Sequence, residues 1–356
     1  MSCQDSKDLL SRIGNRNVGI VKIMEVCGTH TMAIAKSGLR SALPENIKLL
    51  SGPGCPVCVT PAEVIDEILS LAKRDNVIIA TYGDMIKVPG SRRGENLGLL
   101  RAYGARVEIV YSPIDAVRKA AENPKDEVVF IGAGFETTAP GTAASIGEAK
   151  DSGIKNFSVF SLLKTVEPAL RALIADTELQ VSGFLCPGHV ATIIGEKGFS
   201  FLSDEFNIPC AIGGFEPCEI ITALDSILAQ IESGKVKLTN NYPTAVRKGG
   251  NPVAARIIET YLTPRRDIWR GLGVIEKSGL GIREEFEEFD AEKKFDIRIE
   301  PSKEKSPCRC GDVICGKLSP VDCPMFGKAC LPENPVGPCM VSSEGACAAA
   351  YKYGEE

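Results

Sequence analysis

The sequence predicts an α/β protein with two parallel-sheet domains and a cysteine-rich C-terminal part. Short apolar runs alternate with amphipathic helical patterns through about residue 260. Continuous apolar strands separated by helices are typical of parallel sheets covered on both faces. After residue 306 this periodicity ends, and seven of the fourteen cysteines lie between residues 308 and 347. Such a tail cannot fold alone, so a bound metal or docking onto the body is expected to hold it.

Eight apolar runs bounded by turn residues predict strands at 19–24, 47–50, 77–81, 106–110, 128–131, 157–160, 181–185 and 210–212. The spacing of apolar residues between them predicts six helices at 62–72, 94–103, 114–121, 142–149, 168–174 and 220–231. The segment Thr60–Glu63 offers a capping threonine, then a proline, then a glutamate three residues after the cap, so a helix is expected directly after Cys58. Ser112 and Pro113 make a similar start.

The chain is expected to divide into three parts. One α/β domain spans 1–150, a second spans 151–282, and 283–356 holds a charged connection, Arg283–Lys305, and the tail. The connection most simply forms a solvated link or a short edge element. The segments IGAGFE (131–136) and IGGFE (212–216) both follow an apolar strand and precede a helix. Duplication would explain this likeness, and convergence of glycine-rich turns is the alternative.

Composition argues against several classes of function. The formal charge is −5, so neither nucleic acid nor anionic lipid would be attracted over long range. The N-terminal segment is polar, and no apolar run reaches the length of a membrane span. A cytoplasmic protein is therefore expected. Thiols stay reduced there, so fourteen cysteines favour metal binding or thiol chemistry over a disulfide framework.

A cysteine and a histidine follow the first expected strand, in the sequence Cys27-Gly28-Thr29-His30. Gly28 lets the backbone turn closely beside the Cys27 thiol. His30 could lower the pKa of that thiol, bind a metal beside it, or donate a hydrogen bond to a diatomic ligand. A buried cysteine beside a histidine satisfied by the backbone is the ordinary alternative. It is weakened because the chain has only two histidines, both in glycine-containing turns.

A pair of cysteines two residues apart, Cys55 and Cys58, lies between Gly52-Pro53-Gly54 and the expected helix. Two thiols at this spacing can close a disulfide or grip one metal ion. The partial positive charge of the helix start should favour thiolate, so a reactive pair is expected. Chance occurrence in a cysteine-rich chain is the alternative.

The tail cysteines predict an iron–sulfur cluster, because a cube requires four thiolates. An available set is Cys308, Cys323, Cys330 and Cys347. Sets that use Cys310, Cys315 or Cys339 are alternatives. Structural zinc is the main rival, but zinc sites usually show two compact Cys-x-x-Cys knuckles, and the tail has none.

Three further glycine-containing turns are expected to follow strands: Gly134–Thr138, Cys186–Val190 and Gly213–Pro217. The first could receive an anion or the backbone of a partner, and the second presents His189. They should line one edge, because ligands in parallel sheets collect at the carboxyl ends of strands. The remaining thiols, Cys186, Cys210 and Cys218, are interpreted as small buried apolar side chains. No phosphate-binding or dinucleotide-binding glycine fingerprint is present.

Together these motifs resemble the HypD family of hydrogenase maturation proteins. The resemblance rests on CGTH at 27–30, GPGCPVC at 52–58, GFETTAP at 134–140, PGHV at 187–190, GGFEP at 213–217 and MVSSEGAC at 340–347. The motifs occur in this order across nearly the whole chain. The resemblance implies two α/β domains plus a cluster-bearing part.

The resemblance further implies a scaffold that assembles the Fe(CN)2CO group of [NiFe]-hydrogenases. Cys27 would hold iron, Cys55 and Cys58 would belong to the same site or to a thiol relay, and the tail would carry a [4Fe-4S] cluster. The implied partners are a HypC-type small chaperone and a HypE-type cyanide donor. Thiolate suits low-spin iron, and a cluster beside a dithiol could supply electrons, while His30 and His189 orient or protonate ligands. A cluster-containing thiol–disulfide oxidoreductase and a zinc-stabilised interaction module are the alternatives, and whether the protein itself turns over a substrate is left open.

Overall fold

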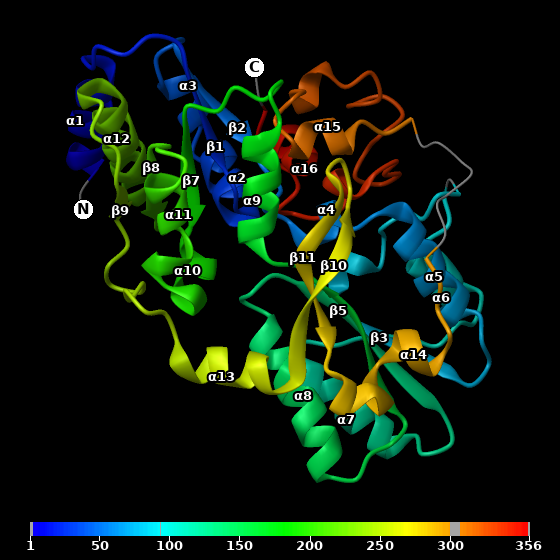
Figure 1. Ribbon diagram of the computed structural model, residues 1–356. Coiled ribbons are helices and arrows are strands. Elements are labelled where there is room, and N and C mark those ends of the chain that lie inside the picture. The colour runs from blue at the N-terminus through cyan, green and yellow to red at the C-terminus, as the bar shows by residue number, and fades with distance from the viewer. Residues whose placement is uncertain (1–2, 93, 300–306, 355–356) are drawn as a thin grey trace.

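The computed structural model describes residues 3–92, 94–299 and 307–354, and its two parallel sheets confirm the α/β prediction (Figure 1). Sheet A has the strand order β2-β1-β7-β8-β9, and sheet B has the order β4-β3-β5-β6. The strands β10 and β11 form an antiparallel hairpin. The bounds are β1 Val21–Glu25, β2 Ile47–Ser51, β3 Val77–Thr81, β4 Val107–Ile109, β5 Glu127–Gly134, β6 Phe157–Leu163, β7 Gly183–Pro187, β8 Cys210–Gly213, β9 Leu238–Asn240, β10 Leu262–Trp269 and β11 Gly273–Ile282.

Helices cover both sheets. The α-helices are α1 Cys3–Gly14, α2 Gly28–Lys36, α3 Leu39–Ala42, α4 Pro56–Val59, α5 Ala62–Ala72, α6 Leu97–Ala102, α7 Pro113–Glu122, α8 Ala139–Asp151, α9 Val166–Ala175, α10 Gly188–Ile194, α11 Ser200–Asp204, α12 Pro217–Ser233, α13 Pro252–Tyr261, α14 Ala291–Lys294, α15 Cys310–Ile314 and α16 Ala346–Tyr353. Single 3-10 turns are η1 Gly83–Met85, η2 Glu196–Gly198, η4 Pro320–Asp322 and η5 Pro338–Met340, and η3 spans Glu284–Phe289. All the strands and helices expected from the sequence are present, and no end differs from its expected position by more than three residues.

Burial explains why the strands could be recognised from continuous apolar runs. Every residue of β3, β6, β7 and β8 is buried. The outermost strands β2, β4 and β9 contain partly or fully exposed residues, whereas β6, the outer strand at the other edge of sheet B, is covered by β11 and α14. Central strands of a parallel sheet lie under helices on both faces, so both sets of side chains must be apolar.

One predicted helix cap is confirmed and another is wrong, although both helices are present. Ser112 and Asp115 form a capping box at α7, with Pro113 as its first residue. Thr60 does not cap α5, which begins at Ala62 after Pro61. The reason is the extra turn α4, whose first carbonyl, that of Pro56, accepts the Thr60 hydroxyl at 2.9 Å.

The sheets divide the chain differently from the contiguous ranges 1–150 and 151–282. Sheet A combines β1 and β2 with β7, β8 and β9, whereas sheet B holds β3 to β6. The chain therefore leaves sheet A after β2, builds sheet B, and returns at β7. The physical reason is the pairing of β1 with β7, in which Ile23 lies opposite Gly183. This pairing joins two segments that are far apart in the sequence.

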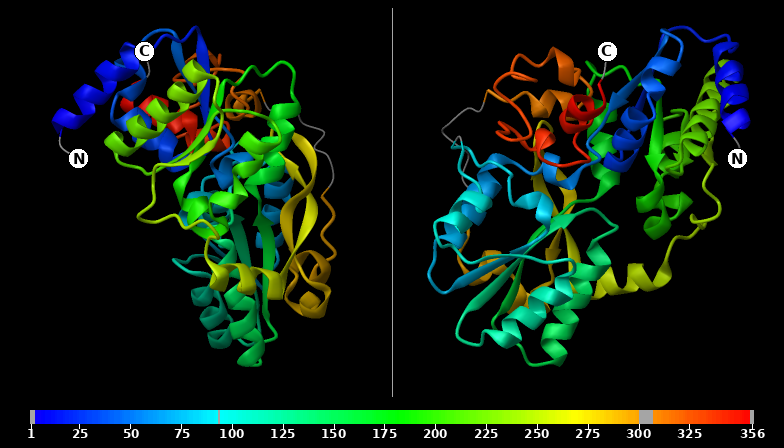
Figure 2. Two further views of the ribbon diagram at one scale, coloured as in Figure 1. Left: turned by 60° about the vertical axis from the view of Figure 1, so that its left-hand side comes forward. Right: turned by 180° about the vertical axis from the view of Figure 1, so that it is seen from behind.

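The tail docks where the two sheets meet. One apolar core combines a face of each sheet with α4 and the tail, and two further cores fill the outer faces. Helix α16 contacts α2, and α15 contacts α4. Both views in Figure 2 show the tail, orange to red, beside the blue N-terminal segment. Docking, one of the two expected means of holding the tail, is therefore present.

The hairpin β10–β11 and the short strand β9 are absent from the predicted elements. Strand β10 includes Pro264 and three charged residues, Arg265–Asp267, so its sequence shows no apolar alternation. The following charged stretch forms η3 and α14, and Asp290 pairs with Val159 of β6. It is thus a short edge element as far as residue 299, and its predicted remainder, 300–305, lies outside the described residues. Within the described part of the chain, no helix is long and apolar enough to cross a membrane.

Candidate functional site

Cys27 lies between the carboxyl end of β1 and the first turn of α2, where it is the N-cap residue. The loop that carries the cysteine pair lies directly on its backbone. The N–H of Gly28 donates to the Gly54 carbonyl at 3.0 Å. A Cβ atom at Gly54 would lie far inside van der Waals contact with the Cys27 backbone. The close approach beside Cys27 therefore requires Gly54, in the loop of the cysteine pair. The sequence had pointed to Gly28 for this role.

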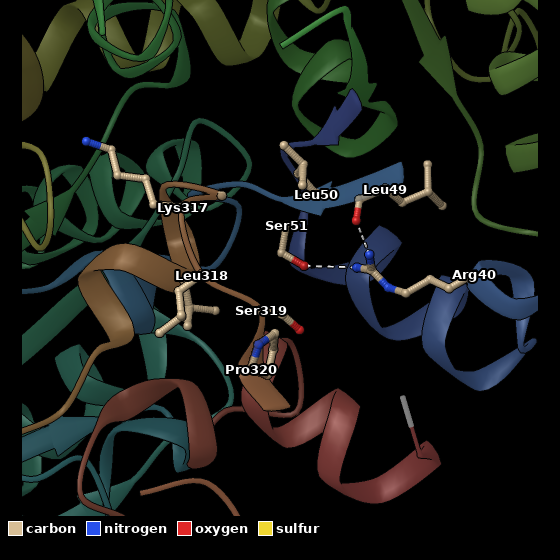
Figure 3. Close-up of a pocket in the computed structure, with 10 residues that line it drawn as sticks. Arg40, Leu49, Leu50, Ser51, Lys317, Leu318, Ser319 and Pro320 are labelled. Carbon is tan, nitrogen blue, oxygen red and sulfur yellow. Dashed lines mark hydrogen bonds between the residues drawn. The ribbon is translucent and has the colours of Figure 1, made fainter. Parts of the chain in front are cut away.

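A buried carboxylate holds Cys27 from the sheet side. Glu25 accepts the Cys27 N–H at 3.2 Å and the Thr31 hydroxyl at 2.5 Å. Burial raises the pKa of Glu25 to about 7, and the positive charge of Arg40 opposes the rise. Figure 3 shows the Arg40 guanidinium donating at 3.1 Å to Ser51, the last residue of β2, in a pocket between β2 and the tail. Arg40 therefore ties the end of β2 to the charge network behind Cys27.

The Cys27 thiol is held neutral. Burial raises the pKa of Cys27 to about 12, and the negative charges of Glu344 and Glu25 add to the rise, whereas backbone hydrogen bonds from His30 and Thr29 oppose it. Burial also lowers the pKa of His30 to about 4, so its imidazole is neutral. The expectation that the His30 side chain lowers the thiol pKa is therefore wrong, because a neutral ring supplies no positive charge.

The two histidines meet on one aromatic ring. His30 Nε2 donates to the Gly214 carbonyl at 2.7 Å, and its Nδ1 is buried with no hydrogen-bond partner among the described residues. The Phe215 ring centroid lies 4.8 Å from that of His30 and 3.9 Å from that of His189. His189 is exposed in the first turn of α10, and burial of part of its ring lowers its pKa. Three motifs thus come together at the carboxyl ends of β1, β7 and β8.

The tail closes over this site through Glu344, a residue to which the sequence assigned no role. Its carboxylate accepts the Thr29 hydroxyl at 2.8 Å. A Cβ atom at Gly28 would lie 2.5 Å from the Glu344 Cβ, so this glycine is needed for the contact. Burial raises the pKa of Glu344, and the charge of Asp84 adds to the rise. The available signal was the position of Glu344 within the motif at 340–347.

Cys55 and Cys58 define the single turn α4. Cys55 is its N-cap, and its Sγ accepts the Cys58 N–H at 3.2 Å. The two Sγ atoms belong to free thiols and lie 2.6 Å apart, so they could close a disulfide with little movement. The expected thiolate is not supported at Cys58, because burial raises its pKa well above the ordinary value and one helical turn has little dipole.

Five of the seven tail cysteines, all within the described residues 307–354, line one apolar cavity. They are Cys308, Cys310, Cys323, Cys330 and Cys347. The other walls are Val313, Met325, Phe326, Val336 and Met340. All four predicted cluster ligands are therefore brought together, with Cys310 as a fifth candidate. Several soft sulfur donors around an apolar cavity fit the donor set of an iron–sulfur cube.

The two remaining tail cysteines lie in different places. Cys339 is buried in η5, which contacts both α4, the turn of the cysteine pair, and α16, which contains Cys347. Cys315 lies outside the cavity, where burial raises its pKa to about 11. In the described ranges, no three His, Cys, Asp or Glu side chains are grouped as ligands of one metal ion. The turn of the cysteine pair nevertheless packs against α15, which begins at the cavity residue Cys310.

The turn Gly134–Thr138 lies apart from the other three turns, at the end of β5 in sheet B. Phe135 belongs to the central core that also contains the cysteine pair. Glu136 accepts the Val166 N–H at 2.8 Å, and its Oε2 is buried with no hydrogen-bond partner among the described residues. The backbone of Val166, the first residue of α9, thus contacts this turn. The expectation that all the turns line one edge is wrong for this one, because it belongs to the other sheet.

We expect Gly54→Ala to lower the free energy of unfolding by about 1–3 kcal/mol, the usual cost of overpacking. The added methyl group would overlap the Cys27 backbone, so the loop must move away. Urea denaturation measures the effect. Gly14→Ala is the matched control, because a Cβ atom there meets nothing within 4 Å. Equal stability of the Gly54→Ala and Gly14→Ala proteins would contradict the contact.

We expect Glu136→Gln to weaken the pH dependence of stability. Burial raises the pKa of Glu136 to about 7, whereas the unfolded chain loses this proton near the ordinary value of 4.5. The folded state therefore binds more protons in this window, so stability falls as pH rises through it. The glutamine still accepts from Val166 and cannot ionise, so the fall should shrink by roughly 1 kcal/mol per pH unit. Urea denaturation at about pH 5, 6 and 7 tests this, and parallel curves for both proteins would refute it.

Comparison with known proteins covers both sheets and the tail. The family model HypD, described as the hydrogenase formation hypA family, matches residues 4–354. The hydrogenase maturation factor HypD of Azotobacter vinelandii is 44% identical over 341 residues, 94% of this chain and 90% of that protein. HypD of Rhodobacter capsulatus is 42% identical over 351 residues, 97% and 93% of the two chains. HypD of Escherichia coli (strain K12) is 42% identical over 337 residues, 94% and 90% of the two. The chain therefore belongs to the HypD family of hydrogenase maturation factors, as its motifs predicted.

Proposed function

We propose that this hydrogenase maturation factor is the scaffold on which the Fe(CN)2CO group is assembled. Cys27 holds the iron jointly with a cysteine of a HypC-type small chaperone, and a HypE-type protein delivers cyanide. A [4Fe-4S] cluster, held by Cys308, Cys323, Cys330 and Cys347, supplies electrons one at a time when bound.

The packing of the cysteine-pair turn against the cysteine-bearing tail is the observation that carries this proposal. Cys55 and Cys58 lie 2.6 Å apart, and their turn α4 contacts both α15, which begins at the cavity residue Cys310, and η5, which contains Cys339. At the other end, the loop of the pair lies on the Cys27 backbone through Gly54. The dithiol therefore stands between the proposed iron thiol and the proposed cluster, where a relay of electrons would need it.

The residues around Cys27 suit a thiol that loses its proton only when a metal ion binds its sulfur. A thiol with a raised pKa stays protonated at neutral pH, and metal binding releases that proton. Glu25 holds the Cys27 backbone through one hydrogen bond, and Glu344 covers the next residues from the tail. His30 Nδ1 remains available as a hydrogen-bond acceptor, and the exposed His189 is placed to exchange protons with solvent.

The alternative of a thiol–disulfide oxidoreductase has less support. Such an enzyme must let a disulfide substrate reach its cysteine pair. The exposed fractions of Cys55 and Cys58 are 4% and 1%, so a protein substrate could not reach either sulfur without rearrangement.

An oxygen-free preparation of the chain with its small partner tests the proposal. We expect brown protein with about four irons and matching acid-labile sulfide per chain, plus extra iron with infrared bands of bound cyanide and carbonyl. Colourless protein with stoichiometric zinc would favour the interaction module. Protein without iron or sulfide that still supports hydrogenase formation in cells would refute the proposal.

A further inference from the structure

The tip of the β10–β11 hairpin reaches the segments that carry the cysteines. In Figure 1 the hairpin extends from the helices of sheet B to the tail. The Arg270 N–H donates to the Val59 carbonyl at 2.8 Å, and its guanidinium donates twice to the Thr60 carbonyl, at 3.1 Å from Nε and 2.8 Å from a terminal nitrogen. The next residue, Gly271, has φ +79°, and a Cβ atom there would lie 2.5 Å from the Gly311 carbonyl oxygen. The tip therefore contacts both α4 and α15.

These contacts place a cation beside the tail cysteines. Gly271 lies against Gly311, which directly follows the cavity residue Cys310, and the Sγ atoms of Cys308 and Cys310 lie 3.0 Å apart. Within the described residues, no carboxylate pairs with Arg270, so its charge is not neutralised. Arg309 differs, because it is exposed and forms an ion pair with Asp312.

A fixed cation next to an iron–sulfur cluster favours the reduced form. One-electron reduction makes the cluster more negative by one charge, and a nearby positive charge stabilises the added electron. The guanidinium is held by two hydrogen bonds to one carbonyl and is half-buried, so its position is defined and it is only partly screened by solvent.

We propose that Arg270 is a positioning residue that raises the reduction potential of the [4Fe-4S] cluster, while the hairpin tip holds the cysteine-pair helix α4 against the cluster segment α15. This inference rests on the proposed function, since it requires the cluster in the tail cavity. It assigns a role to a hairpin that none of the sequence motifs includes.

Redox titration of the intact protein, followed by the electron paramagnetic resonance signal of the reduced cluster, tests this inference. Arg270→Gln removes the charge, and we expect it to shift the ratio of reduced to oxidised cluster about tenfold toward the oxidised form, which is about 59 mV for a one-electron couple. Arg270→Lys keeps the charge and should shift the ratio by less than about threefold, or about half of that potential change. Arg309→Gln is the matched control, and its shift should be smaller than that of Arg270→Gln.

Each outcome decides the inference. Equal potentials for the wild-type and Arg270→Gln proteins would overturn it, and so would an Arg270→Lys shift as large as that of Arg270→Gln, because the hydrogen bonds rather than the charge would then matter. Arg270→Met, which keeps the aliphatic stem, serves if Arg270→Gln does not fold. Iron content and thermal unfolding report any structural loss separately. Wild-type protein without iron and sulfide would instead refute the proposed function itself.

Discussion

Cys27→Ala protein, copurified with its small partner, is expected to lose the infrared bands of iron-bound cyanide and carbonyl completely. In the proposed site Cys27 is the sole ligand that this chain supplies to that iron, so no neighbouring sulfur can replace it. The substitution should leave the fold intact, because Glu25 binds the backbone N–H of residue 27 rather than its side chain. Infrared spectroscopy of the oxygen-free complex measures the bands, and iron analysis should still find the cluster iron.

A second thiol variant controls for general damage. Cys218 is half-buried in the first turn of α12, outside the group of motifs around Cys27. Cys218→Ala should keep the bands at wild-type intensity and bind the partner equally well. Bands at full intensity in the Cys27→Ala complex would show that another group holds the iron.

Alanine at any one of the four predicted cluster ligands is expected to remove most of the cluster iron and sulfide. A cube that loses one of four thiolates is no longer fully ligated, so the expected loss is from about four irons per chain toward none. Cys347→Ala is the most informative of the four variants. Its helix α16 packs against α2, whose N-cap residue is Cys27, so this ligand connects the proposed cluster with the proposed iron site. Iron and sulfide analysis of oxygen-free protein, with the visible absorption spectrum, gives the result.

Two further cysteines make the experiment specific. Cys315→Ala should retain the full iron content, because this thiol lies outside the cavity. Cys310 lines the cavity, and a Cβ atom at Gly337 would overlap the sulfur atoms of both Cys308 and Cys310. If Cys310→Ala loses the cluster and one of the four predicted variants keeps it, the predicted ligand set is wrong by one residue.

Local patterns were sufficient for eight strands and six helices and for naming most of the candidate site residues. The runs at β3 and α5 were predicted to the residue, because a buried strand and an amphipathic helix each impose their own period on the sequence. The four proposed cluster ligands were selected from spacing and context alone, and the structure places all four around one cavity. Chemically distinctive residues in short motifs are thus visible without a structure.

Local patterns misled where burial sets the electrostatics. The sequence suggested thiolates activated by His30 and by a helix start, but Cys27 and Cys58 are buried thiols with raised pKa values. Burial depends on which distant segments cover a residue. Here α16 of the tail covers α2, and neither segment alone reveals the contact.

The sequence by itself determined the class of fold, the family and the choice of candidate site residues, since each follows from periods and motifs within a few neighbouring positions. Only the tertiary structure decided that β1 pairs with β7, that Glu344 and Gly54 close around Cys27, and that the hairpin tip at Arg270 and Gly271 contacts α4 and α15. These contacts join residues far apart in the chain. They are selected by the packing of whole sheets and the tail against one core, which no local pattern encodes.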